Sequence, residues 1–421
     1  MNFKKDVLFA KKNRKTEAIF ISLISMLFFL FLYKILTAQS MLSHDSIRWY
    51  GVYHLFADSL LNGIFPYWDP FDSCGQPFYY NLGILRLYEP ITVGFIMLQK
   101  VFNSSILSIY HWEYIIRIWL VALGVYLCYR QTNKYLLSSC MVFAVFLFSS
   151  FAVTSFRQNG VLYVFFWTPL AMYFFLKLLK DFSLYNVIGF SFFIGLSLIN
   201  YQGVYILTYL FIFILTLLIN KRKYLISVFK NAKNLVRIFA GIIVVVILAL
   251  PLLGIYIEKD KIIPSVRLRD KAEISEGINL AYDSIEKAGT HSNIADFLEL
   301  VFPPVARGYF WHWFPVSGAA LSECFLYIGI FPLVLGILGA VKSRQEYRKN
   351  FLITLVLVGL LMLGPKYGIH RLIYFLFYPL RVTRHMHLFA GFFIFTLLYF
   401  VGQGIDFVID NTLAKFTKDG R

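Results

Sequence analysis

Residues 18–36 read AIFISLISMLFFLFLYKIL, an apolar run that follows a basic leader. A run of about 18 or more apolar residues is long enough to cross the hydrocarbon core of a bilayer as a helix. This run is longer than the apolar region of a signal peptide, and further apolar runs follow it, so we interpret it as a retained anchor. The sequence therefore predicts an all-α, polytopic membrane protein.

The composition supports this class. Of 421 residues, 59% are hydrophobic and only 15% are charged, whereas soluble domains are about 25% charged. We expect one integral membrane domain over residues 1–421, with about ten transmembrane helices. The predicted spans are 18–38, 106–129, 136–155, 161–179, 185–200, 203–220, 235–257, 322–341, 350–364 and 388–405.

The distribution of charge predicts the orientation. With the N-terminus inside, the inner segments hold 23 Lys and Arg against 7 Asp and Glu, and the outer segments hold 15 against 16, with Lys34 and Arg117 left out of the count. An excess of basic residues in cytoplasmic loops is the positive-inside bias. The net charge of +17 therefore indicates a cell-membrane protein with both termini in the cytoplasm, and argues against a nucleic-acid partner.

Two long outer loops are expected, at residues 39–105 and 258–321. A third outer segment, 366–387, contains an apolar run that is too short to span the ~30 Å hydrocarbon core, so we predict an interfacial or re-entrant helix there. The alternative, an eleventh crossing, would place the C-terminal tail outside. Cys74 and Cys324 both fall on the outer side, the latter at the outer end of the span 322–341, and their pairing stays open.

The first outer loop has a helical pattern of apolar residues at a spacing of three to four, which predicts an amphipathic helix on the membrane surface. Asp45 immediately precedes this pattern. It is interpreted either as a helix N-cap or as a carboxylate base that takes a proton from an acceptor hydroxyl. The apolar positions are Trp49, Val52, Tyr53, Phe56, Leu60 and Ile64.

Other polar residues of this loop are weaker candidates. His44 is interpreted as a polar neighbour of Asp45 or as a substrate contact. Asp72 is a candidate second carboxylate or cation ligand; a divalent cation is left open, and the metal-binding residues are unknown. Asp69 precedes a proline, as turn residues often do, and Glu89 is interpreted as structural.

Glu113 and Arg117 lie four residues apart in the outer half of the second predicted span. Ionisable groups at membrane depth are costly, face the bundle interior and are by default functional. The competing interpretation is an ion pair that neutralises itself along one helix. We keep both residues as candidate substrate-binding groups.

The stretch RLIYFLFYPLRVTRHMH (371–387) concentrates positive charge on the outer side. Arginine suits bidentate recognition of phosphate, so a lipid phosphate is the expected partner of Arg371, Arg381, Arg384 and His385. The alternative is ordinary contact with anionic headgroups. Arg157, between the third and fourth spans, is expected to line an outer cavity.

The second outer loop offers two further features. Asp296 and Glu299 are three apart on a predicted helix and therefore share a face, which we interpret as solvated. Trp311 and Trp313 are candidates for stacking on a sugar ring, or for anchoring the loop in the membrane interface.

An inside N-terminus, a first span that ends near an Asp, and a long outer loop with a surface helix resemble the GT-C class of polytopic glycosyltransferases. Within that class the chain resembles the bacterial YfhO-like membrane proteins. The similar stretches are GIFPYWDPFDSCGQPFYYN in the first loop, FFWTPLAMYFFLKLL, SLINYQGVY, FLYIGIFPLVLG and PLRVTRHMHLFAGFF.

The resemblance implies inverting transfer of a sugar from a polyprenyl-phosphate donor to an envelope glycan or lipid acceptor on the outer face. By position, Asp45 matches the first-loop acid of the class, and Arg381 and Arg384 correspond to contacts with the donor phosphate. Two other functions stay open from the residues alone. A transporter or lipid flippase would place polar residues through the spans, and a noncatalytic envelope-assembly protein would tolerate substitution of the first-loop acids.

Overall fold

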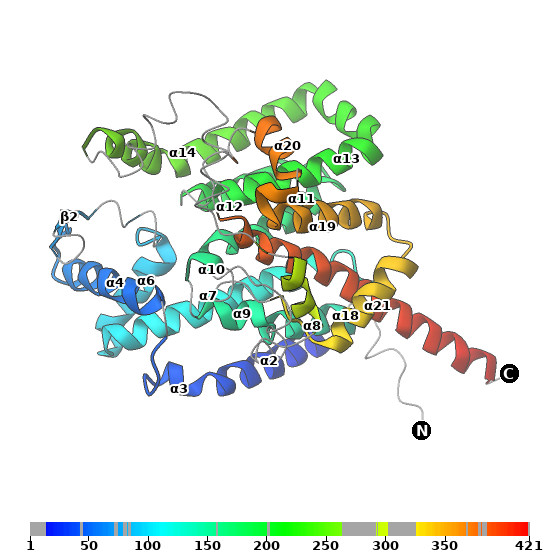
Figure 1. Cartoon of the computed structure of the whole chain (residues 1–421), viewed down its shortest axis with the longest axis horizontal. Coiled ribbons are helices and arrows are strands. Elements are labelled where there is room, and N and C mark those ends of the chain that lie inside the picture. Colours follow the sequence, from blue (N-terminus) through cyan, green and yellow to red (C-terminus); the bar gives the residue numbers. More distant parts are fainter. Residues whose placement is uncertain are drawn as a thin grey trace.

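A computed structural model of the chain (Figure 1) describes residues 14–42, 45–70, 75–78, 82, 86–156, 159–199, 203–262, 292, 294–301, 326–367, 369–377, 380 and 385–419. Within this part every element is a helix, apart from one antiparallel pair of two-residue strands, β1 (Trp68–Asp69) and β2 (Gln76–Pro77). The expectation of an all-α chain is confirmed.

The helices follow one another with short connections. The N-terminal part and the first loop contain α2 (Arg14–Phe31), α3 (Tyr33–Leu36), α4 (Asp45–Leu61) and α6 (Pro90–Phe102). The α-helices that follow are α7 (Ile106–Tyr129), α8 (Leu136–Leu147), α9 (Ser150–Ser155), α10 (Asn159–Phe165), α11 (Thr168–Leu178), α12 (Leu184–Leu198), α13 (Val204–Lys230), α14 (Ala232–Ile262), α18 (Ile330–Lys342), α19 (Arg348–Met362), α20 (Ile369–Leu376) and α21 (Ala390–Asp419). Short 3-10 helices are η2 (Ile294–Leu300), η6 (Gly364–Tyr367) and η8 (Met386–Phe389).

Five helical segments in the described part are long and apolar enough to cross a membrane. The chain is thus helical and has candidate membrane spans, as predicted. Helix occurs within each of the ten predicted span segments, but the number of crossings beyond these five stays a prediction. The five segments are Ile106–Tyr129, Leu136–Val153, Gly160–Leu178, Ala232–Leu250 and Met386–Ala414, and α13 adds a sixth if its two bent halves form one span.

Helix α21 forms the centre of the bundle, since 100% of its apolar window is buried. It packs against α18, α19 and α8. A Cβ atom on Gly339 of α18 would lie 1.9 Å from the Phe400 carbonyl oxygen, and one on Gly404 would lie 1.9 Å from the Leu335 carbonyl oxygen. Small residues allow membrane helices to approach this closely, so both glycines set the distance between α18 and α21.

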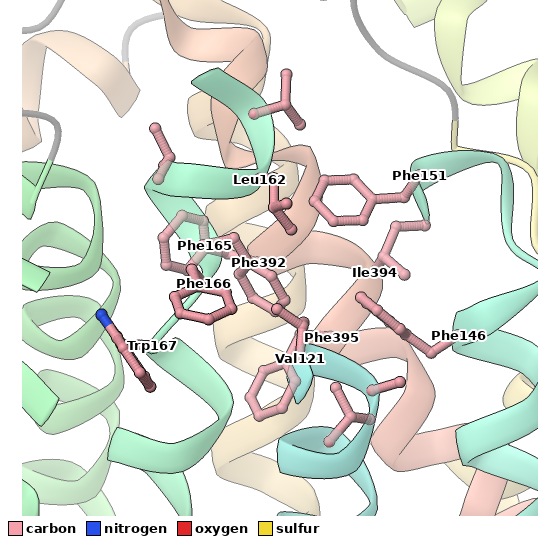
Figure 2. Close-up of a cluster of buried hydrophobic side chains, with 14 of the residues drawn as sticks. Val121, Phe146, Phe151, Leu162, Phe165, Phe166, Trp167, Phe392, Ile394 and Phe395 are labelled. Carbon is pink, nitrogen blue, oxygen red and sulfur yellow. The ribbon is translucent and has the colours of Figure 1, made fainter. Parts of the chain in front are cut away.

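An aromatic core lies between α21 and the segment from α8 to α11 (Figure 2). Phe165 of α10 packs edge-on against Phe392 of α21, with ring centroids 5.4 Å apart, and also against Phe151 of α9 at 5.6 Å. Phe146 of α8 closes the cluster. Figure 2 shows the indole nitrogen of Trp167 pointing away from these rings, so its N–H group is available to a polar partner outside the aromatic core.

Helix α14 has the opposite character, because only 11% of its apolar window is buried. Val236, Phe239 and Ile247 are 64–70% exposed along it. Soluble monomers rarely expose a continuous apolar face of this kind, so this face of α14 suits contact with lipid.

The loops predicted to be cytoplasmic meet at one end of the bundle. We call this the basic end and define it as residues 130–135, 179–183, 221–231 and 343–347. The elements of the first loop lie on the left of Figure 1, and the C-terminal end of α21 lies on the right. The contacts that join these loops are Lys180 to the Gln131 carbonyl at 3.1 Å, the Tyr224 hydroxyl to the Leu178 carbonyl at 2.8 Å, and the ion pair of Lys221 with Glu346.

Candidate functional site

The first-loop helix α4 begins at Asp45, nine residues after α3 ends at Leu36. Its first turn is attached to the bundle, because the Tyr110 hydroxyl of α7 donates a buried hydrogen bond of 2.9 Å to the Ser46 backbone carbonyl. Two to three turns further on, Val52, Tyr53 and Phe56 are buried. The backbone that carries Asp45 is therefore held against α7; whether α4 also lies on the membrane surface stays a prediction.

Several predicted site residues lie outside the described residues. They are His44, Asp72, Arg157, Trp311, Trp313, Arg381 and Arg384, and the same holds for Cys74 and Cys324.

Glu113 and Arg117 form the ion pair that their spacing predicts, with Arg117 Nε 2.9 Å from Glu113 Oε1. Their side chains are only 4% and 0% exposed. The Arg117 guanidinium also lies 4.9 Å from the ring centroid of Phe166, a cation–π contact that is favourable when desolvated. Both charges thus face the bundle interior, as expected for ionisable groups in an apolar helix.

Glu89, interpreted from the sequence as structural, and Arg86, which the sequence analysis did not single out, complete a four-charge group. Glu89 accepts from Arg117 Nη1 at 2.7 Å and from Arg86 Nη1 at 2.5 Å. All three side chains are at most 1% exposed. We call Arg86, Glu89, Glu113 and Arg117 the charged cluster. It holds two positive and two negative groups, so its formal charge is zero.

Neutral side chains satisfy much of the remaining hydrogen-bonding capacity. Thr92 Oγ1 donates to Glu113 Oε1 at 2.7 Å and accepts from Arg117 Nη2 at 2.8 Å. The indole nitrogen of Trp167, which points away from the aromatic core in Figure 2, donates to Glu89 Oε1 at 3.1 Å. A buried ion network repays its desolvation only when its geometry is good and further hydrogen bonds are made, and both conditions hold here.

Arg86 extends the charged cluster to distant helices. Its guanidinium donates to the backbone carbonyls of Leu196 at 3.0 Å and Tyr163 at 2.7 Å. The nearby Tyr88 hydroxyl donates to the Ile199 carbonyl at 2.8 Å. These bonds use carbonyls at the C-terminal end of α12 and within α10, so the end of the first loop is attached to two helices more than 70 residues away.

The buried charges also determine the protonation of two first-loop residues, Glu89 and Tyr53. Burial alone would raise the pKa of Glu89, but the adjacent Arg86 and Arg117 guanidinium groups outweigh it and hold that pKa below its ordinary range. Burial and the negative Glu113 raise the pKa of Tyr53 well above its ordinary range. Tyr53 therefore stays protonated and donates a 3.0 Å hydrogen bond to Glu113 Oε2, which links α4 to the charged cluster.

This arrangement can position groups rather than react. Both of its carboxylates are buried and paired with guanidinium groups, so neither of them is a free base. Tyr53 and Tyr110 connect α4 to α7, and the charged cluster connects α7 to the segment before α6 and to α10 and α12. The cluster is therefore a rigid support beneath the first loop, and direct contact of Glu113 or Arg117 with a substrate stays a prediction.

Two of the predicted phosphate-binding residues fall within the described part. Arg371 is exposed on the short helix α20. His385 is partly buried before η8, and its backbone carbonyl accepts a 3.1 Å hydrogen bond from Tyr205 at the start of α13. The rings of His385 and His387 lie 5.7 Å apart. The helix α20 falls inside the predicted outer segment 366–387, but its relation to the membrane stays a prediction.

The solvated face expected for Asp296 and Glu299 is wrong. Their residues are 4% and 2% exposed, because η2 packs onto the bundle with Phe297 edge-on against Phe393 of α21. Glu299 accepts from the Leu326 backbone N–H at 3.3 Å. Spacing alone shows that two residues share a face, but not which face is covered.

Another buried carboxylate, missed in the sequence, has a structural explanation. Asp406 of α21 accepts from the backbone N–H groups of Lys134 at 2.7 Å and Tyr135 at 3.1 Å, and from Ser138 Oγ at 2.5 Å. These groups lie at the start of α8, whose first N–H groups have no partner within the helix. Asp406 thus caps α8 from a helix that is distant in sequence.

Among the residues that the structure describes, no group of three or more His, Cys, Asp or Glu side chains is placed to hold a metal ion. The charged cluster and the first turn of α4 are accordingly the best-defined polar arrangement on which a function can be argued. No protein-family model matches the chain, and no curated protein matches it either.

Proposed function

We propose that the chain is a GT-C-like membrane glycosyltransferase with about ten spans, which transfers a sugar from a polyprenyl-phosphate donor to an envelope glycan or lipid on the outer face of the cell membrane. Asp45 is the base. Arg371, Arg381, Arg384 and His385 bind the donor phosphate, and the basic end faces the cytoplasm, where positive loops are retained.

One observation carries this proposal. A general base must be held within hydrogen-bond reach of the proton that it takes. Asp45 is the first residue of α4, and the Tyr110 hydroxyl binds the Ser46 carbonyl beside it. Tyr53, two turns along, is bound to the buried Glu113. The backbone of this turn is therefore held by the bundle, although it belongs to a loop. This attachment supports a catalytic role for Asp45 over that of a simple cap.

In the proposed reaction, Asp45 accepts the proton of an acceptor hydroxyl while that oxygen attacks the anomeric carbon of the donor sugar. The bond between this carbon and the phosphate oxygen breaks, and its electron pair stays on the polyprenyl phosphate. Positive groups placed where negative charge develops lower the barrier, which is the role of Arg381 and Arg384. Trp311 and Trp313 stack on the sugar.

The test compares two aspartates of the same helix. A deletion strain is complemented with wild type, Asp45→Asn or Asp58→Asn, and its envelope glycans and glycolipids are profiled by mass spectrometry. Asp58 is exposed on α4, so its substitution controls for loss of charge in the loop. We expect wild type and Asp58→Asn to restore a missing sugar and Asp45→Asn, at equal membrane abundance, to fail. Restoration by Asp45→Asn would overturn the assignment.

A transporter is the second candidate, because α7 is long enough to cross a membrane and carries two buried charges, Glu113 and Arg117. Transport predicts that Glu113→Gln abolishes movement of a lipid-linked sugar between the leaflets of proteoliposomes, while Asp45→Asn does not. Loss of an envelope sugar in the deletion strain, with no sugar transfer and no lipid movement by the purified wild-type protein, would leave noncatalytic envelope assembly as the function.

A further inference from the structure

Helix α13 has an elbow at Lys221. The backbone there is non-helical, with φ −126° and ψ 24°, and the halves Val204–Ile219 and Lys221–Lys230 meet at 102°. The first half is apolar, whereas the second begins Lys221-Arg222-Lys223. If the first half runs along the membrane normal, the second half lies almost in the membrane plane.

One face of this second half is docked on the protein. Val228 is 6% exposed. The Tyr224 hydroxyl donates to the Leu178 carbonyl at the end of α11, and Lys221 pairs with Glu346 before α19. The helix is therefore attached to the bundle at the basic end.

The other face combines apolar and basic side chains. Ile226 and Phe229 are 41% and 60% exposed, and Arg222, Lys223 and Lys230 are exposed around them. Residues 221–230 contain no acidic residue. A merely solvated basic face gives no reason for an exposed isoleucine and an exposed phenylalanine among its basic groups. Helices that lie in a bilayer interface have this composition, because the apolar side chains enter the acyl region while the basic groups reach the headgroups.

The neighbouring elements indicate the depth of this face in the membrane. It is preceded by the apolar half of α13 and followed by α14, which exposes Val236 and Phe239. A short helix between two such segments lies at the level of the headgroups. That position favours a lipid over a soluble partner such as an RNA or an acidic peptide.

We propose that residues 221–230 form a docking surface for anionic phospholipid headgroups of the leaflet at the basic end. The lipid phosphates pair with Arg222, Lys223 and Lys230, and Ile226 and Phe229 insert between the acyl chains. This surface is independent of the proposed transferase activity.

The test uses the full-length protein in mixed micelles, with retained phosphatidylglycerol and phosphatidylcholine measured by native mass spectrometry. Wild type is expected to retain phosphatidylglycerol preferentially, and added salt should weaken this preference. The triple variant Arg222→Gln/Lys223→Gln/Lys230→Gln should weaken apparent binding of phosphatidylglycerol on the order of 100-fold, as expected for three basic groups near an anionic surface. Phe229→Ser should weaken retention of both lipids and leave the salt dependence unchanged.

The matched control is Lys342→Gln/Arg344→Gln/Lys349→Gln, which removes three exposed charges from the same end of the bundle. An equal loss in this control would overturn the proposal in favour of diffuse charge at the basic end. Equal retention of the two lipids by wild type would overturn it without any variant, so misfolding of the triple variant cannot rescue it. Displacement of the bound lipid by millimolar inorganic phosphate would identify a phosphate site instead.

Discussion

Substitution of Glu89 by glutamine is the sharpest test of the charged cluster. The Glu89 carboxylate accepts from three donors, Arg86 Nη1 at 2.5 Å, Arg117 Nη1 at 2.7 Å and Trp167 Nε1 at 3.1 Å, and its side chain is 0% exposed. Glutamine keeps the shape but offers one acceptor oxygen, and it turns an N–H group toward an arginine donor. The cluster would also change from neutral to a buried net charge of +1.

The expected loss follows from this imbalance. Removing one partner of a buried ion pair costs about 3–5 kcal/mol, because the other charge stays buried without compensation. The free energy of unfolding of a folded protein is roughly 5–15 kcal/mol, so Glu89→Gln should remove a large fraction of the stability. The double variant Arg86→Met/Glu89→Met removes one charge of each sign and leaves the Arg117–Glu113 pair, so it should lose less than the single variant.

The assay is thermal unfolding of the full-length protein in one detergent, with the monodisperse fraction measured by size exclusion. Glu346→Gln is the control, because it breaks an ion pair whose glutamate side chain is 56% exposed, and exposed pairs contribute about 0–1 kcal/mol. The reasoning is refuted if Glu89→Gln lowers the unfolding temperature no more than Glu346→Gln. It is also refuted if the double variant is less stable than Glu89→Gln.

Two further predictions concern packing and acid. Gly339→Ala should separate α18 from α21, because its Cβ would meet the Phe400 carbonyl oxygen at 1.9 Å. The free energy of unfolding should fall by about 1–3 kcal/mol or more, which thermal unfolding would detect. Gly94→Ala is the control and should be neutral or stabilising, because its Cβ would meet nothing within 4 Å. The folded pKa of Glu89 lies below its ordinary value of 4.5, so the unfolded chain binds more protons as acid is added, and stability should be complete above pH 4.5 and fall as the pH drops through the folded pKa. Unfolding temperatures measured between pH 6 and 3 check this, and a flat profile would contradict it.

The membrane helices could be predicted because hydropathy reports directly on the environment of a span. The predicted span 106–129 coincides with α7. The elbow of α13 was missed, since the basic residues after Ile219 were expected to form a loop. Lysine and arginine are good helix formers, so the chain resumes as helix after one non-helical residue.

The candidate site could be predicted only where its contacts are local. The Glu113–Arg117 pair follows from the spacing of four residues, but Arg86 reaches the carbonyl of Leu196, 110 residues away. The sequence did contain a signal for the other two members of the charged cluster, since Arg86 and Glu89 are the only charged residues between Asp72 and Lys100. Charges isolated in so apolar a segment need partners from elsewhere in the fold.

The position of α21 has a consequence for how the protein is made. In the part of the chain that the structure describes, the helices that pack against α21 precede it in the sequence, so the ribosome delivers the centre of the bundle after these helices. Until α21 docks, Phe146, Phe151 and Phe165 lack the partners that bury them in the folded bundle, and the incomplete bundle is open to proteolysis. We therefore expect substitutions that slow this docking, such as Gly339→Ala, to lower the amount of mature protein more than they lower the melting temperature of the molecules that have folded.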